Sequence, residues 1–254
     1  MAPGGEGSAF TVTLHFDRDL SFFLPRRSAT AMVTRVLSEK TSVKDIIESC
    51  GVPHTEIGAI TVDGVNVDFA HQLSSDGEVF VRGLQDPDTP NEQSLHRTGL
   101  TRFVADGHLG KLARDLRLLG FDVVYAPHAD DPTLVRISAD EERALLTRDR
   151  RLLMHRAVRD GYCVRSTDPD EQIVEVLQRF AIEAMIAPYT RCIACNGSLK
   201  VVAKGDIIDQ LEPLTRIHYE EFRRCSECGK IYWSGSHFGK LQARLAMIRA
   251  AIAR

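Results

Sequence analysis

No apolar run in this chain approaches the roughly 20 residues that a membrane-spanning helix needs, so we expect no transmembrane segment. The first residues also lack the basic head and apolar core of a secretory signal peptide. We therefore expect a cytoplasmic protein whose thiols stay reduced. A formal net charge of −3 at pH 7 gives no overall attraction to nucleic acid, although a local basic surface could still bind phosphates.

The composition excludes a disordered chain, because 43% of the residues are hydrophobic and 26% are charged, as in ordinary globular proteins. A length of 254 residues suits about two domains. We place the main boundary in residues 85–100, which begin as a polar, proline-containing segment without hydrophobic periodicity and are predicted to be a linker.

The segment before this linker has the pattern of a small mixed α+β domain. Residues 10–16 alternate apolar and polar side chains, which is typical of a half-buried strand, and residues 30–37 are a second candidate strand. We expect a hairpin to join them. Ser42 begins a predicted helix that ends at Gly51. Further strands are predicted over residues 59–62, 65–69 and 78–82.

This order of elements resembles the β-grasp, ubiquitin-like fold over residues 9–84. The stretches VPHTEIGAITVDGVNVDF and LSSDGEVFV are similar to the small sulfur-carrier branch of that fold. Sulfur carriers need a free terminal Gly-Gly, whereas here the last strand ends Arg82-Gly83-Leu84 and the chain continues, so we exclude sulfur transfer. We expect a docking domain that binds a protein partner.

Strands alternate with helices after the linker, over residues 101–188. Apolar strands are predicted to end at Ala105, Tyr125, Thr147 and Arg165, and helical patterns follow, one of them over residues 150–161. This alternation predicts an α/β domain with a parallel sheet covered on both faces.

Carboxylates follow the first three of these strands: Asp106, then Asp130 and Asp131, then Asp149. Because the carboxyl ends of parallel strands meet at one edge of a sheet, we expect these acids to lie close together. Like charges repel unless a cation offsets them, and Mg²⁺ or Mn²⁺ prefers oxygen ligands. The pattern therefore predicts a metal-dependent phosphodiesterase site.

The alternative is that these acids only cap helices, since Asp is among the best N-cap residues. We favour capping for Asp168, which precedes Pro169, and catalysis for Asp106 and Asp149. Asp131 precedes Pro132 and is predicted to cap the next helix, so both interpretations apply to it.

Basic residues accompany the acids along the chain. They could bind phosphates or form a solvated face, and Arg148 and Arg150 are the stronger candidates because they flank Asp149. The full set is Lys111, Arg114, Arg117, Arg143, Arg148, Arg150, Arg151, Arg156 and Arg159.

Two C-x-x-C pairs lie in residues 189–254: Cys192 with Cys195, and Cys225 with Cys228. Four thiolates at this spacing predict a tetrahedral, structural Zn²⁺ site in a zinc ribbon. A redox dithiol would need a thioredoxin-like unit, and disulfides are disfavoured in a reducing cytoplasm.

The end of the chain combines aromatic residues with a basic helix. Tyr232, Trp233, His237 and Lys240 could contact RNA by stacking and charge, although packing against the ribbon is the simpler role for the aromatic rings.

The segments FVADGHLGKLARDLRLLGFDVVY, ADDPTLV and RALLTRDRRLL resemble the RNase domain at the C-terminus of the Mut-seven exonuclease, a branch of the PIN-like nucleases. The likeness covers roughly residues 101–254. It implies an α/β/α nuclease fold that uses clustered acids and Mg²⁺ or Mn²⁺ on RNA. Asp106 matches the first acid of the family pattern and Asp149 the later strand-end acid, while Asp130 or Asp131 matches the intermediate one. Asp140, Glu141 and Glu142 compete for that intermediate role.

We therefore expect a metal-dependent ribonuclease. The alternative is a non-catalytic RNA-binding or ribosome- or tRNA-associated protein that uses the zinc ribbon and the basic helices. If the linker separates independent domains, a fragment that begins after residue 92 stays soluble and keeps any nuclease activity.

Overall fold

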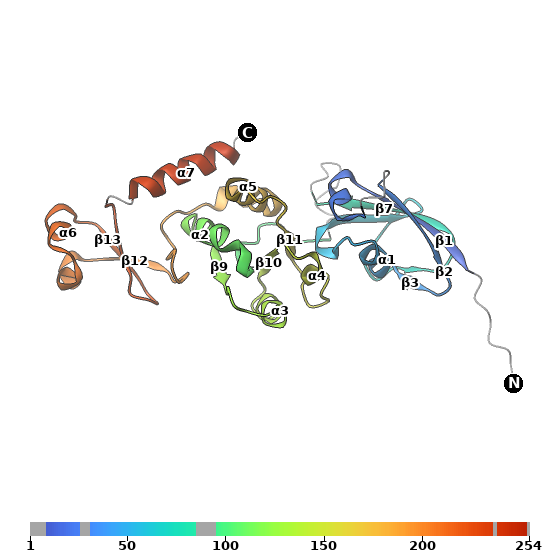
Figure 1. Cartoon of the computed structure of the whole chain (residues 1–254), viewed down its shortest axis with the longest axis horizontal. Helices are drawn as coiled ribbons and strands as arrows, with labels where there is room; N and C mark the ends of the chain where they lie inside the picture. The colour runs from blue at the N-terminus through green and yellow to red at the C-terminus, as the bar shows by residue number, and fades with distance from the viewer. Residues whose placement is uncertain (1–8, 26–30, 85–94, 236–237, 253–254) are drawn as a thin grey trace. The chain divides into compact units, whose positions relative to one another are not determined.

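The computed structural model describes residues 9–25, 31–84, 95–235 and 238–252 (Figure 1). By their contacts these residues form two compact units. The first contains the described residues up to Arg97 together with Asp149–Cys163, and the second contains Thr98–Arg148 and the described residues from Val164 onward. Most of the predicted linker falls on residues 85–94, outside the described residues.

A mixed sheet forms the first unit, with its strands in the order β2 (Met32–Leu37), β1 (Phe10–Phe16), β7 (Gly77–Gly83), β4 (Ile57–Val62) and β5 (Val65–Val67). β1 is parallel to β7, and the other neighbours are antiparallel. The predicted helix is α1 (Val43–Ser49), whose N-cap Ser42 accepts a hydrogen bond from Asp45 N at 3.1 Å. A separate pair consists of β3 (Thr41–Ser42) and β6 (Gln72–Leu73). This topology confirms the predicted β-grasp domain.

The connection between β1 and β2 is longer than the predicted hairpin. The two strands do pair antiparallel, but the short helix η1 (Arg18–Phe23) lies between them in the chain. Leu20 and Phe23 of this helix are buried. The connection therefore adds to the core of the first unit instead of making only a turn.

Residues 149–163 begin with the helix α4 (Arg150–Leu153), which is much shorter than the helix predicted over residues 150–161. The predicted helix is too long because the chain turns after Leu153, and this turn buries Val158, which has no exposed surface. The ring Nε2 of His54 lies 2.8 Å from the carbonyl oxygen of Val158. A contact distant in sequence thus replaces the local helical pattern.

Two further side chains hold this segment in the first unit. Glu56 accepts a 2.6 Å hydrogen bond from the backbone N–H of Cys163, in the strand β11 (Gly161–Cys163). Arg97 pairs with Asp160 at 2.6 Å. By their contacts, residues 149–163 therefore belong to the first unit, whereas the predicted boundaries place them in the domain 101–188.

A parallel sheet forms the centre of the second unit, where β10 (Ala144–Thr147), β8 (Arg102–Ala105) and β9 (Asp122–Tyr125) are neighbours in that order. The helix α2 (Gly110–Leu118) packs against β9 and against α5 (Pro169–Phe180), while α3 (Asp131–Asp140) packs against β8 and β10. All four residues of β10 are buried, as are Phe103, Val104 and Ala105 in β8, whereas in β9 only Val123 is buried. This arrangement confirms the predicted α/β class.

The second unit ends in an antiparallel sheet with the strand order β12 (Leu199–Val202), β13 (Phe222–Cys225) and β14 (Ile231–Trp233). A segment containing α6 (Pro213–His218) connects β12 to β13. The last helix, α7 (Phe238–Ile252), packs against α5. None of the described helices is long and apolar enough to cross a membrane.

A protein that begins at residue 93 lacks His54 and Glu56, which bond to the backbone of residues 149–163. Because a buried group that loses its partner costs about 1–3 kcal/mol, we expect this segment to open in the fragment. Hydrogen exchange followed by mass spectrometry should show fast exchange at residues 149–163, with a protein that begins at residue 9 as the control. If residues 149–163 keep native-like protection in the fragment, the two domains are independent and this expectation is wrong.

Candidate functional site

Asp106 lies directly after β8, at the carboxyl edge of the parallel sheet, and is only 7% exposed. One carboxylate oxygen accepts a 2.7 Å hydrogen bond from the backbone N–H of His108. The other oxygen accepts a 2.5 Å hydrogen bond from the hydroxyl of Thr147, at the end of the neighbouring strand β10. The orientation of the carboxylate is therefore fixed from two sides.

The turn after Asp106 packs closely against β9. The Tyr125 hydroxyl donates a 2.9 Å hydrogen bond to the carbonyl of Gly107. A Cβ atom at Gly110 would lie 2.6 Å from the same hydroxyl, which explains why glycine occupies this position. The strand, turn and helix that present Asp106 thus form one packed element.

Thr147 was not among the predicted site residues. It is fully buried at the end of an apolar strand, so its hydroxyl needs a hydrogen-bond partner inside the protein. The sequence signal was a polar residue that ends the run Ala144-Leu145-Leu146, one strand away from an acid.

The other candidate acids are exposed helix caps. The side chain of Asp130 accepts a 3.1 Å hydrogen bond from Thr133 N and caps α3, so Asp130 and not Asp131 is the N-cap. Hydrogen bonds from the side chain and backbone of Thr133 lower the pKa of Asp130 below its ordinary value. Asp131 occupies the first position of the helix, before the proline, where its negative charge interacts favourably with the helix dipole.

Asp149 belongs to the first unit, where its side chain caps α4 by accepting a 2.8 Å hydrogen bond from Arg151 N. Asp168 caps α5 in the same way, at 2.8 Å from Asp170 N, which confirms the capping role that the sequence favoured. Each candidate acid is thus an N-cap or the residue beside one, and Asp106 differs from the others by its burial.

Two of the predicted phosphate-binding residues are used inside the second unit. Arg117 is 5% exposed and donates to the carbonyl of Val123 at 2.8 and 3.0 Å. Arg143 is 7% exposed and pairs with Asp122 and with Glu141, both at 2.7 Å. The phosphate-binding interpretation was therefore wrong for Arg117 and Arg143, and Glu141 has a structural partner.

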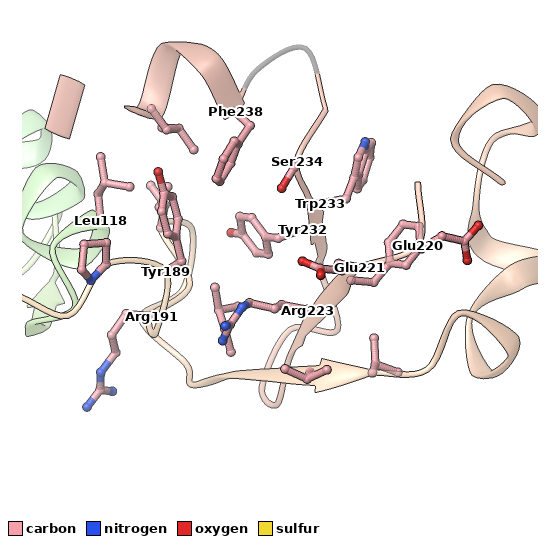
Figure 2. Close-up of a pocket in the computed structure, with 17 residues that line it drawn as sticks. Leu118, Tyr189, Arg191, Glu220, Glu221, Arg223, Tyr232, Trp233, Ser234 and Phe238 are labelled. Carbon is pink, nitrogen blue, oxygen red and sulfur yellow. The ribbon is translucent and has the colours of Figure 1, made fainter. Parts of the chain in front are cut away.

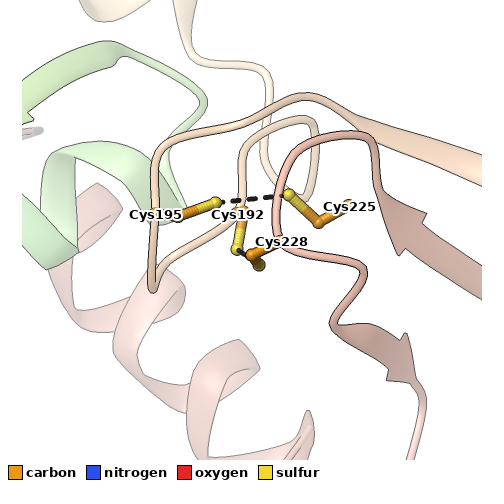
Figure 3. Close-up of side chains that lie close together, drawn as sticks. All are labelled: Cys192, Cys195, Cys225 and Cys228. Carbon is orange, nitrogen blue, oxygen red and sulfur yellow. Dashed lines mark hydrogen bonds between the residues drawn. The ribbon is translucent and has the colours of Figure 1, made fainter.

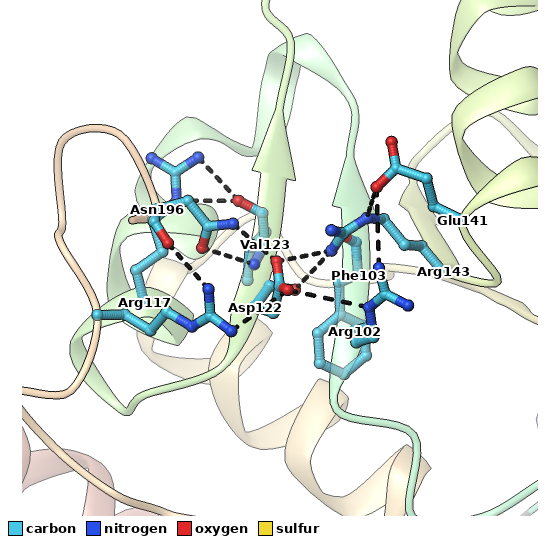
Figure 4. Close-up of polar contacts among 9 residues, drawn as sticks. Arg102, Phe103, Arg117, Asp122, Val123, Glu141, Arg143 and Asn196 are labelled. Carbon is cyan, nitrogen blue, oxygen red and sulfur yellow. Dashed lines mark hydrogen bonds and ion pairs between the residues drawn. The ribbon is translucent and has the colours of Figure 1, made fainter. Parts of the chain in front are cut away.

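Asp122 is the centre of a polar network at the amino end of β9 (Figure 4). Its carboxylate accepts hydrogen bonds from Arg143, from Arg191 at 3.3 Å and from the amide nitrogen of Asn196 at 2.7 Å. Partial burial alone would raise the pKa of Asp122, but the hydrogen bonds and charges of these partners outweigh it and lower the pKa.

Asn196 docks the first cysteine pair on the sheet. Its backbone φ is 75°, and its side-chain oxygen accepts a 2.9 Å hydrogen bond from Val123 N of β9. Arg117 reaches the same loop and donates to the carbonyls of Ile193 and Ala194 at 3.2 and 3.0 Å. Asn196 was not among the predicted site residues, because nothing near it in the sequence indicates the partner strand.

The four predicted ligand cysteines point toward one another (Figure 3), and their Sγ atoms all lie within 4.8 Å of one another. The Sγ atoms of Cys195 and Cys225 are 3.3 Å apart, and those of Cys192 and Cys228 are 3.7 Å apart. Tetrahedral zinc with Zn–S bonds of about 2.3 Å would place its sulfurs about 3.8 Å apart, so the cluster could hold such an ion. Among the described residues, no other group of three or more His, Cys, Asp or Glu gathers its ligand atoms in this way.

The thiols of this cluster differ in their acidity. Burial alone would raise the pKa of Cys192, but the 3.0 Å contact with the Tyr232 hydroxyl and backbone hydrogen bonds at Ala194 and Cys195 lower it to about 6. Burial and the neighbouring thiols raise the pKa of Cys195 to about 12. Such a cluster cannot ionise fully unless a cation offsets the negative charges.

Comparison with known families agrees with the architecture of both parts of the chain. Residues 101–245 match the family described as the Mut7-C RNAse domain. Because this match covers more than half of the chain, the protein belongs to that family, as the sequence resemblance predicted. Residues 9–87 match the family described as Mut7-C ubiquitin. No curated protein matches the chain significantly. The family description indicates RNA as the substrate and a ribonuclease-type function.

Asp122→Asn tests the network at β9. Because the pKa of Asp122 is lowered in the folded protein, its charge stabilises the fold above the unfolded-state pKa of about 3.9, and this contribution falls as the pH drops through the folded-state value. We expect the variant to be less stable at pH 7, with a deficit that shrinks below about pH 4. Urea unfolding between pH 3 and 7 measures this, with the exposed Asp209→Asn as the control. A deficit that is constant with pH would contradict the charge-based explanation.

Proposed function

We propose that the protein is a metal-dependent ribonuclease that hydrolyses RNA phosphodiester bonds. Asp106 and Asp149, with Asp130 and Asp131, are the acids proposed to hold Mg²⁺ or Mn²⁺. The observation that carries this proposal is the buried Asp106 carboxylate, fixed by Thr147 and His108 at the carboxyl edge of the sheet in the region that matches an RNase family.

The Asp106 carboxylate retains capacity for a metal. Each of its oxygens has two acceptor positions, and the hydrogen bonds from His108 N and Thr147 occupy one position on each. A bound Mg²⁺ or Mn²⁺ would neutralise charge on the phosphate oxygens and make a bound water more acidic. Thr147 acts as a positioning residue, because its hydroxyl aims the second oxygen of Asp106.

Five basic residues are the proposed RNA contacts, and they differ in how far their charge is already used. Lys111 pairs with Asp115 at 3.0 Å, and Arg150 donates to the carbonyl of Phe23 at 3.0 Å. The other three, Arg114, Arg148 and Lys240, are exposed and make no side-chain ion pair within the described part of the chain. These three are therefore the stronger candidates for phosphate binding.

We propose a structural Zn²⁺ ion in the cysteine cluster, a reducing cytoplasmic location that keeps the thiols free, and a protein partner for the ubiquitin-like domain. Association with a ribosome or tRNA belongs to the alternative function, a non-catalytic RNA-binding protein that uses the ribbon and the basic helices.

Cys195→Ser and Cys228→Ser test the zinc proposal. We expect elemental analysis of the purified protein to find one zinc ion per chain and each variant to lose it. Because zinc-binding energy stabilises the folded ribbon, residues 189–235 should then exchange their amide hydrogens quickly while the β-grasp domain stays protected. Cys50→Ala, at a buried cysteine outside the cluster, is the control for losing a thiol. Soluble, folded protein without zinc would exclude this proposal.

Asp106→Asn tests the ribonuclease proposal, with Asp168→Asn as the matched control because both residues are N-caps. The amide keeps the shape of the carboxylate and removes its charge, so we expect cleavage of single-stranded and hairpin RNA to fall by orders of magnitude while the fold survives. Asp168→Asn should keep its activity and lose about 1 kcal/mol of stability or less. Thr147→Val should weaken the apparent affinity for Mg²⁺ or Mn²⁺ by about 10–100-fold, as for other residues that orient metal ligands.

The assay compares Mg²⁺, Mn²⁺ and no added divalent ion. Cleavage that survives both Asp106→Asn and Asp149→Asn would contradict the proposed acids. Tight RNA binding without any cleavage would favour the RNA-binding alternative.

A further inference from the structure

Tyr232 connects the two cysteine pairs of the ribbon. It lies in β14, within the hairpin that carries Cys225 and Cys228, and its side chain points to the opposite side of the strand from that of Trp233 (Figure 2). Its hydroxyl oxygen lies 3.0 Å from the Sγ atom of Cys192, in the first pair. One side chain therefore joins two loops that are far apart in the sequence.

The pairing of β13 with β14 fixes the position of Tyr232. Arg223 is its cross-strand neighbour, and the backbone N–H of Cys225 donates a 2.9 Å hydrogen bond to the carbonyl of Lys230. Because side chains alternate along a strand, Tyr232, Lys230 and Cys225 lie on the same face of the ribbon. The Nζ atom of Lys230 lies 5.8 Å from the centre of the Tyr232 ring. The ring is thus held on the face of the ribbon that carries the cysteines.

The Tyr232 hydroxyl is the donor in its contact with Cys192. A zinc ligand is a thiolate, which has no proton to donate, so its sulfur can only accept. Cys192 has no exposed surface, so water cannot supply the same hydrogen bond. In the described part of the chain, no other hydroxyl bonds to a sulfur of the cluster. Cys192 therefore differs from the other three ligand cysteines.

The four cysteines also differ in their exposure. Cys192 and Cys225 are buried, whereas Cys195 and Cys228 are exposed. The sulfur of Cys195 accepts a 3.4 Å hydrogen bond from the backbone N–H of Gly197. The cluster thus has a buried side, where the tyrosine reaches Cys192, and an open side.

Packing alone does not explain why a tyrosine occupies position 232. Its ring lines a groove together with Tyr189 and Phe238, and phenylalanine would fill this place equally well. Only the hydroxyl distinguishes tyrosine from phenylalanine, and its side-chain partner is the Cys192 sulfur.

We propose that Tyr232 is a positioning residue for the proposed Zn²⁺ site, on which this inference rests. Its hydroxyl orients the Cys192 thiolate toward the other three cysteines and disperses part of its negative charge. Four thiolates around one divalent ion keep a net negative charge, so a donor to one of them stabilises the loaded cluster. Zinc then leaves from the open side, at Cys195 and Cys228.

Cobalt reports on this hydrogen bond, because the sulfur-to-Co²⁺ charge-transfer band depends on the electron density of the sulfurs. The full-length protein is produced with Co²⁺ in place of zinc for absorption spectra, and the zinc-loaded protein is titrated with a chelator. We expect Tyr232→Phe to move the band to lower energy and to weaken Zn²⁺ binding about ten-fold, the lower end of the range for residues that support metal ligands. Tyr219→Phe, at a tyrosine that packs against Phe222, is the matched control and should change neither.

The order of cysteine alkylation gives a second measurement. Zinc-loaded protein is treated with N-ethylmaleimide, and mass spectrometry of its peptides gives the initial rate at each cysteine. In the native protein, the exposed Cys195 and Cys228 should react first. Tyr232→Phe should raise the rate at Cys192 several-fold and leave the rate at Cys225 unchanged, because only Cys192 loses a donor.

The proposal is overturned if the native protein and Tyr232→Phe have the same charge-transfer band and the same zinc affinity, or if Tyr219→Phe has equal effects. If Tyr232→Phe does not fold, replacement of Tyr232 by 3-fluorotyrosine keeps the test decisive. The more acidic hydroxyl of this residue is a stronger donor and should move the band to higher energy, so an unchanged band would overturn the proposal. These results leave the zinc site itself intact, whereas native protein that binds neither Co²⁺ nor Zn²⁺ would remove the zinc site and this inference together.

Discussion

The hydrogen bonds around Asp122 and Val123 are the interaction on which the second unit depends. β9 is an edge strand, and an edge strand presents unpaired backbone groups. Asn196 accepts the hydrogen bond of Val123 N, and Arg117 donates to the carbonyl of the same residue. The loop of the first cysteine pair therefore closes the sheet where a further strand would otherwise be needed.

This closure divides the arginines of the second unit into two groups. Arg117, Arg143 and Arg191 act inside the protein, where each guanidinium bonds to several oxygens at fixed positions. Arg114 and Arg223 are exposed and without a partner in the described part of the chain, so their charges are available to a ligand. In the sequence both groups occur at similar spacing beside acids, and only the packing separates them.

The elements that could be predicted are those with local causes. The apolar runs predicted where β9 and β10 end, at Tyr125 and Thr147. The Asp-Pro pair at residues 168 and 169 likewise predicted the N-cap of α5. The cysteine spacing likewise identified the cluster, because each pair and its turn are short-range features. Thr147 and Asn196 were missed as site residues, since their partners lie on strands far away in sequence. The helix predicted after Asp149 ended early for the same reason, because His54 binds the carbonyl of Val158.

The register of β8 and β9 separates the two proposed metal sites. Arg102 pairs with Asp122 at the amino end of the strands, where Asn196 docks the cysteine loop, and Ala105 pairs with Tyr125 at the carboxyl end, where Asp106 follows. Parallel strands rise about 3.3 Å per residue, so these ends lie about 10 Å apart along the sheet. The cysteine cluster is thus anchored at the end of the sheet away from Asp106. A zinc ion there would have four thiolate ligands and no position left for substrate, so its role would be to support the sheet edge. Hydrolysis would need a separate ion at the carboxyl edge, held by oxygen ligands that begin with Asp106.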